Sequence, residues 1–200
     1  MVETLLRYKP TIQYKFVRWL QPREGWITCN IDGASKGNPG QSTYGFCLRD
    51  SKGDLIYAEA QNLGITTNME AEAKAMWEAL QYCIRNQLNN IQLETDSLVL
   101  KNMIYRNWRI PWELAEIMDD IHDVLGKITV NVQHIFREAN QLAYFIANSA
   151  INTEGKQIFL NFQQLPSRGR KLLNIDKQQV HSIRIKTRRI SNTNYNGQHD

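Results

Sequence analysis

The feature that most constrains the fold is a change in hydrophobic period along the chain. Residues 26–32 alternate apolar and polar side chains, and residues 42–49 and 55–63 also read as strands of this kind. From Met69 the apolar residues instead recur at spacings of three and four. Alternation is typical of a strand with one buried face, whereas spacings of three and four are typical of a helix. The sequence therefore predicts three consecutive strands followed by a helix.

The rest of the central region continues with alternating elements. Residues 91–96 and 129–136 have the strand pattern, and helical patterns begin at Ser97, at Pro111 and after Asn140, which we expect to cap the last helix. An order of three strands, helix, strand, helices, strand and helix favours an α/β fold. We expect a five-stranded mixed sheet, with three antiparallel strands and two parallel strands, flanked by helices.

Charge and composition divide the chain into three parts. Residues 1–24 are predicted to be a leader or linker, residues 25–152 a single domain, and residues 153–200 a flexible basic tail. The tail has nine Lys and Arg residues against three Asp and Glu residues. Such a tail fits an attraction to phosphate backbones, and the alternative that it only keeps the protein soluble stays open.

Some classes of protein are disfavoured. No segment approaches the roughly 18 to 20 apolar residues needed to cross a bilayer, and residues 1–20 lack the apolar core of a signal peptide. The odd number of cysteines, without metal-ligand spacing, predicts buried reduced thiols at Cys29, Cys47 and Cys83. We expect a soluble monomer inside the cell, in the nucleus or cytoplasm, with no contact with a membrane.

Three carboxylates are placed to meet. Asp32 and Asp96 end two predicted strands, and Glu72 lies on the edge of the helix's apolar stripe. Glu70 falls on the polar face, where we expect a solvated ion pair with Lys74 four residues on. Three acids that converge need protonation or a divalent cation. Two such ions about 3.5 to 4 Å apart promote phosphodiester cleavage. The alternative, that these are ordinary surface acids, is left open by spacing alone.

Four sequence blocks lie in the order and spacing of a known family. They are residues 31–40 (IDGASKGNPG), 66–72 (TTNMEAE), 94–97 (ETDS) and 134–143 (HIFREANQLA). They resemble the signature blocks of ribonuclease H type 1, most of all the domains of plant non-LTR retrotransposons and their stand-alone relatives. The resemblance covers about residues 26–152 and implies a ribonuclease H-like fold.

The resemblance also implies roles for single residues. It makes Asp32, Glu72 and Asp96 the catalytic acids that bind Mg²⁺, with Mn²⁺ as a substitute, and His134 a flexible catalytic histidine. It implies contact with an RNA/DNA hybrid for four further residues: Gly33, Asn38, Thr67 and Asn68. The family cleaves RNA within such hybrids, because it distinguishes the two strands by the 2′-hydroxyl.

One position departs from the family. Its fourth acid, ten residues after the histidine, is replaced here by Tyr144, and no Asp or Glu occurs from Ala139 to Thr153. A neutral phenol is a poor ligand for a hard cation. The first hypothesis is therefore an RNA/DNA hybrid endonuclease with impaired activity. The second is a catalytically inactive, hybrid-binding remnant of a retroelement.

Overall fold

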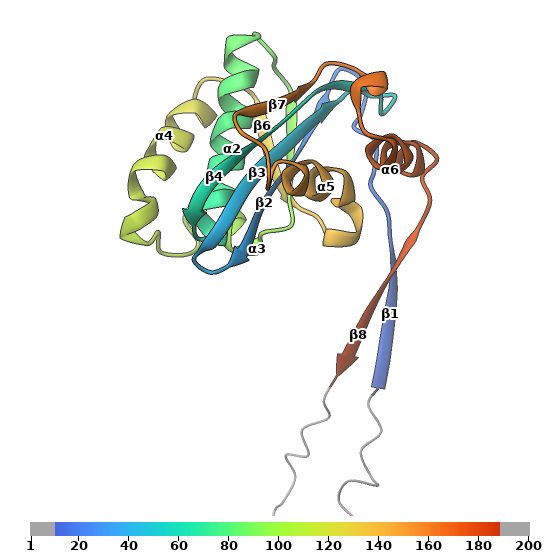
Figure 1. The fold of residues 1–200 in the computed structure, drawn as a ribbon, viewed down its shortest axis with the longest axis horizontal. Helices are drawn as coiled ribbons and strands as arrows, with labels where there is room; N and C mark the ends of the chain where they lie inside the picture. Colours follow the sequence, from blue (N-terminus) through green and yellow to red (C-terminus); the bar gives the residue numbers. More distant parts are fainter. Residues whose placement is uncertain (1–10, 189–200) are drawn as a thin grey trace, which may run out of the picture.

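The protein is built around one mixed sheet. A computed structural model describes residues 11–188, and its central sheet has the strand order β6-β5-β2-β3-β4-β7 (Figure 1). The strands are β2 (Ile27–Gly37), β3 (Gly40–Arg49), β4 (Leu55–Thr66), β5 (Ile91–Thr95), β6 (Val130–His134) and β7 (Lys156–Phe159). β2, β3, β4 and β7 pair antiparallel, while β5 and β6 run parallel to β2. The predicted antiparallel and parallel parts of the sheet are both confirmed.

Helices cover both faces of this sheet. The helices are α2 (Asn68–Arg85), α3 (Leu98–Ile104), α4 (Ala115–Leu125), α5 (Gln141–Ser149) and α6 (Ser167–Lys177), with short 3₁₀ turns at Trp112–Leu114, Arg137–Ala139 and Phe162–Gln164. Phe46 and Leu48 of β3 belong to the core that includes α2, α3 and α4. Cys47, between them, belongs to the core on the other face, with α5 and α6 (Figure 1). This alternation follows from the two-residue period of a strand.

The sheet has six strands, and the prediction of five was wrong. β7 lies in residues 153–200, which we expected to form a flexible tail, and it pairs with the edge of β4. The same region contains α6, whose Leu173 is buried, and the strand β8 (Ser182–Arg188). These elements are short, and their few apolar residues become buried only through long-range contacts, so local composition did not predict them. Residues 189–200 of the predicted tail lie outside the described residues.

The predicted leader also contains regular structure. β1 (Thr11–Val17) pairs antiparallel with β8 and forms a separate two-stranded sheet, which we call the ribbon. The ribbon projects away from the central sheet (Figure 1). Residues 1–10 of the leader lie outside the described residues. The predicted leader or linker and the predicted flexible tail therefore pair with each other.

A buried arginine ties both extensions to the domain. Arg49 is 1% exposed, and its guanidinium carbon lies 3.5 Å from the centroid of the Trp19 ring. Its Nη1 donates to Asp176 Oδ2 at 2.7 Å, and its Nη2 donates to Asn30 Oδ1 at 2.6 Å. Trp19 precedes the domain and Asp176 lies in α6. One side chain of β3 thus contacts the leader, the tail region and the central sheet.

Two further predictions concern the cysteines and membrane-spanning segments. All three cysteines are free and buried, as predicted. Within residues 11–188, no helix combines the length and apolar character that crossing a membrane requires.

Candidate active site

The structure brings Asp32, Glu72 and Asp96 together. One carboxylate oxygen from each residue lies within 4.8 Å of those of the other two. β2 and β5 are parallel neighbours with Asn30 paired to Glu94, so Asp32 and Asp96 each stand two residues farther along. The prediction that Asp32 ends its strand was wrong, because residues 33–37 still pair with β3. Glu72 joins them from the first turns of α2, which packs on β2. We call these three residues the acid cluster, and the predicted convergence is confirmed.

The acid cluster is buried and short of partners. Asp32 is 1% exposed and Glu72 is 5% exposed. Burial raises the pKa of Asp32 well above its usual value, and Asp96 raises it further. Burial also raises the pKa of Glu72, with added contributions from Asp32 and Asp96. Among the described residues, none donates a hydrogen bond to either Asp32 carboxylate oxygen or to Glu72 Oε2.

This arrangement fits a divalent cation. A buried carboxylate without a partner is costly, and three of them repel one another. Oxygen ligands are what hard cations such as Mg²⁺ and Mn²⁺ prefer. A cation bound by Asp32, Glu72 and Asp96 would remove the repulsion and fill the missing interactions.

Gly33 permits the close contact between α2 and β2. A Cβ built at Gly33 would lie 2.3 Å from the backbone nitrogen of Glu72, which is too close for any side chain. The resemblance implied that this glycine lets an RNA strand approach. In the structure the space that a side chain would need is filled by the backbone of α2. Gly33 therefore positions Glu72 against Asp32, and contact with RNA at this residue stays a prediction.

Thr67 and Glu70 form the N-terminal cap of α2. The Thr67 side chain accepts a hydrogen bond from the Glu70 backbone, and the Glu70 side chain accepts one from the Thr67 backbone at 2.9 Å. This reciprocal pair is a capping box, which satisfies free backbone donors at the start of a helix. The predicted pair between Glu70 and Lys74 is wrong, because Lys74 Nζ lies 3.1 Å from Glu78 Oε1 instead.

Asn38 and Asn68 lie together at the surface near this cap. The backbone N–H of Asn68 donates to Asn38 Oδ1 at 3.0 Å, which joins the β2–β3 turn to the first residue of α2. Both side chains are exposed. The structure therefore places these two predicted contact residues side by side, and their contact with nucleic acid stays a prediction.

His134 stands next to the acid cluster. It ends β6 and pairs in register with Thr95, the residue before Asp96. The side chain is half-buried, and burial lowers its pKa even though Asp96 acts in the opposite direction. A histidine with a lowered pKa is mostly neutral at pH 7 and has a free ring nitrogen for a proton.

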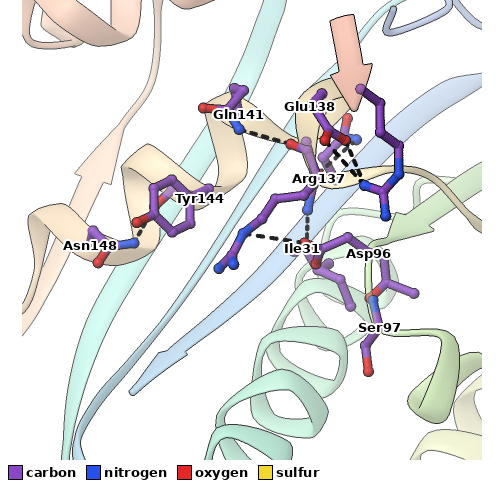
Figure 2. A network of polar contacts seen from close by, with 12 residues as sticks. Ile31, Asp96, Ser97, Arg137, Glu138, Gln141, Tyr144 and Asn148 are labelled. Carbon is purple, nitrogen blue, oxygen red and sulfur yellow. Dashed lines mark hydrogen bonds and ion pairs between the residues drawn. The ribbon is translucent and has the colours of Figure 1, made fainter. Parts of the chain in front are cut away.

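Arg137 and Tyr144 lie where the family's fourth acid was expected. Tyr144 is in the first turn of α5, and the Arg137 guanidinium carbon lies 4.9 Å from the centroid of its ring. Arg137 Nε also lies 3.8 Å from Asp96 Oδ2 (Figure 2). The structure therefore has a cation beside the acid cluster at this position. Sequence reasoning missed this role of Arg137, although the residue stands in one of the four blocks.

Asn140 stands at the N-cap position of α5, as predicted, but its side chain does not cap the helix. It is 1% exposed and makes no side-chain hydrogen bond to the start of that helix. Its Nδ2 instead donates to the backbone oxygen of Ile31 at 2.8 Å, and its Oδ1 accepts from Asn30 Nδ2 at 3.2 Å. The burial of α5 against β2 turns the side chain toward the strand. Asn140 therefore supports the strand that carries Asp32.

The sequence is similar to that of known proteins over most of the domain. The family model described as "Reverse transcriptase-like" matches residues 30–150. A provisionally named ribonuclease H protein of Arabidopsis thaliana is 31% identical over 139 residues, which are 69% of this chain and 22% of that protein. Ribonuclease HI of Halobacterium salinarum is 27% identical over 142 residues, which are 66% of this chain and 68% of that protein. The chain thus spans only about a fifth of the plant relative.

Solved structures of ribonucleases H have a similar fold. The crystal structure of RNase H1 from Halobacterium salinarum superimposes with a TM-score of 0.60 at 26% identity, covering 63% of this chain and 97% of that one. LC11-RNase H1, whose structure was solved in complex with an RNA/DNA hybrid, gives a TM-score of 0.59 at 26% identity, with 63% and 96% coverage. With its fold and the matched sequence, the chain belongs to the ribonuclease H family.

Proposed function

We propose that this chain is a metal-dependent endonuclease that hydrolyses the RNA strand of RNA/DNA hybrids. The observation that carries the proposal is the acid cluster, whose three carboxylates lie within 4.8 Å of one another and include unpartnered buried oxygens. Support comes from the similarity to ribonuclease HI and to a relative that was crystallised with a hybrid.

The residues around the cluster have distinct proposed roles. Asp32, Glu72 and Asp96 would hold Mg²⁺, or Mn²⁺ in its place, which would supply Lewis-acid activation of water and charge stabilisation at the phosphate. His134, half-buried beside Asp96, accepts or returns a proton at its ring nitrogen. Asn38, Thr67 and Asn68 bind the hybrid's backbone, so cleavage depends little on base sequence.

Tyr144 limits the proposed activity. It provides no carboxylate, and the Arg137 cation lies between its ring and Asp96. A positive charge there opposes binding of a second divalent ion, so we propose weak activity that needs a high metal concentration. This observation also favours the second candidate, an inactive hybrid-binding remnant of a retroelement. An origin in plant retroelements stays a prediction.

A cleavage assay distinguishes the two candidates. The full chain is incubated with a labelled RNA/DNA hybrid in Mg²⁺ or Mn²⁺, with single-stranded RNA, duplex RNA and duplex DNA of the same sequence as controls. The proposed function requires internal cuts in the RNA of the hybrid alone. It also requires that Asp32→Asn reduce the rate more than about 100-fold, since even groups outside a metal's ligand shell often contribute 10- to 100-fold. Binding of the hybrid without cleavage would select the remnant.

A further inference from the structure

The ribbon of β1 and β8 has two chemically different faces. Side chains alternate between the faces of a two-stranded sheet, and directly paired residues share a face. One face is apolar and exposed to solvent, and it consists of Ile12, Tyr14, Phe16, Ile183 and Ile185. The other face is polar and basic, and it includes Gln13 paired with Lys186 and Lys15 paired with Arg184. We call this second face the basic face.

The basic face begins beside the acid cluster. Lys15 Nζ and the Arg184 guanidinium carbon lie 4.8 Å and 4.6 Å from the centroid of the Phe136 ring. Arg184 Nη1 also pairs with Glu138 Oε2 at 2.9 Å. Phe136 and Glu138 are the two neighbours of Arg137, which reaches Asp96, and Figure 2 shows Glu138 and Arg137 at this junction. The ribbon is therefore joined to the loop that borders the site.

The rest of the ribbon extends beyond the domain. In Figure 1 it projects past the end of the central sheet at which the β2–β3 turn, with Asn38, is found. Its seven paired residues span about 23 Å at about 3.3 Å per residue, which matches roughly seven base pairs of a duplex. Lys15 and Lys186 are exposed, and neither pairs with a carboxylate within residues 11–188.

We propose that the basic face of the ribbon binds the phosphate backbone of the hybrid beside the stretch held over the acid cluster. The proposal rests on the proposed function, because it takes the RNA/DNA hybrid as the ligand. Lys15 of β1 and Lys186 of β8 lie on the same face without a carboxylate partner among the described residues, and such lysines attract backbone phosphates. The pairing with Glu138 holds the near end of the ribbon at the site, so that the far end lies along the flanking duplex.

The test compares hybrids of two lengths. Binding is measured by fluorescence anisotropy with the full chain carrying Asp32→Asn, which prevents cleavage, and hybrids of about 8 and about 24 base pairs. Neutralising Lys15 and Lys186 together, as Lys15→Gln and Lys186→Gln, should weaken binding of the long hybrid about tenfold. The slope of log K against log salt should fall by about 2, because each phosphate contact contributes about 0.9. Binding of the short hybrid should change less than twofold.

A matched control keeps the same change of charge away from the ribbon. Lys52→Gln and Lys127→Gln alter two exposed lysines at the opposite end of the sheet, where Thr28 pairs with Arg49 and Ile91 with Val130. This control should leave both affinities within twofold. Circular dichroism melts should show that both double variants fold like the parent.

Several outcomes would overturn the inference. Equal weakening on both hybrid lengths would mean that the lysines contact the stretch over the acid cluster and not the flanking duplex. No weakening on the long hybrid would exclude the basic face as a backbone-binding surface. A concentration-dependent dimer that Ile185→Ser dissociates, with hybrid binding unaffected by the lysine variants, would make a second copy of the chain the ribbon's partner. Failure of the proposed function would look different. The parent chain would then show no cleavage in Mg²⁺ or Mn²⁺, while the lysine variants would still lose affinity mainly for the long hybrid.

Discussion

Two clusters of buried polar side chains lie two residues apart on β2 and differ in how they are satisfied. Around Asn30, each amide and carboxylate group finds a partner. Asn30 Nδ2 donates to Glu94 Oε2 at 2.8 Å, and its Oδ1 accepts from Arg49. Glu94 Oε1 accepts from Gln133 at 2.6 Å. Around Asp32, both carboxylate oxygens have no donor among the described residues.

The difference separates a structural network from a site. Buried polar groups are normally hydrogen-bonded, and a satisfied network makes the interior unique. Burial raises the pKa of Glu94, but its amide and arginine neighbours act in the opposite direction. Asp32 has only Arg137 acting in that direction, against burial and Asp96. The comparison indicates that buried acids without hydrogen-bond donors mark the place where we expect a ligand.

The largest effect is expected from breaking the hydrogen-bonded cluster around Asn30. Arg49→Met leaves Asp176 and Asn30 without their donor and should cost about 3 kcal/mol, since removing one partner of a buried ion pair is strongly destabilising. This corresponds to a Tm lower by roughly 10 °C in a thermal melt. Asp54→Asn, which removes the exposed pair with Lys177, should shift Tm by less than about 2 °C. Equal shifts in both variants would contradict the distinction between the clusters.

A smaller effect is expected from completing the unsatisfied cluster. Tyr144→Asp adds a fourth carboxylate beside Arg137 and Asp96, and it should raise the hybrid cleavage rate about tenfold at limiting Mg²⁺, a barrier change of about 1.4 kcal/mol. Tyr144→Phe keeps the ring without adding a charge and should behave like the parent. If the parent and Tyr144→Asp cleave a hybrid equally well, a carboxylate at residue 144 does not contribute to metal binding.

Removing one acid should stabilise the metal-free protein. The pKa values of Asp32 and Glu72 are higher in the folded than in the unfolded protein. The free energy of unfolding therefore falls as pH rises from about 4, and the destabilisation is complete once pH exceeds the folded-state pKa values. Asp32→Asn should therefore raise Tm in a chelator at pH 8 by about 2 to 4 °C, or about 1 kcal/mol, with little gain at pH 4. Mg²⁺ should raise the Tm of the parent more than that of the variant. A variant that melts lower than the parent at pH 8 would refute this account.

The smallest effect is expected from Glu70, which lies outside both clusters and accepts a hydrogen bond in the cap of α2. Glu70→Ala removes one half of the capping box of α2 and should cost about 1 kcal/mol or less, because a cap satisfies only a few backbone donors. Urea unfolding should show a lower midpoint with an unchanged slope. Glu154→Ala, in an exposed position, should leave the midpoint unchanged. A change in slope would mean that the substitution altered more than the cap.

The sequence by itself determined the elements and the acids of this protein. Hydrophobic periods predicted the strands β2 to β6 and the helices between them, because burial on one face leaves a local pattern. The predicted end of β5 placed Asp96, and the edge of the α2 stripe placed Glu72. The strand pattern also placed Asp32 near them, although β2 continues past it to Gly37. The four blocks further predicted the family, since their order and spacing are specific.

Only the tertiary structure decided the remaining contacts. Arg137 meets Tyr144 and Asp96, Asn140 meets Ile31, and α2 fills the space beside Gly33. The pairing of β1 with β8 and the addition of β7 join segments that are far apart in the chain. No local period encodes such contacts, because each depends on which surfaces meet after the sheet has formed. The local sequence pattern thus predicted which residues are buried, whereas packing determined the partner of each buried polar group.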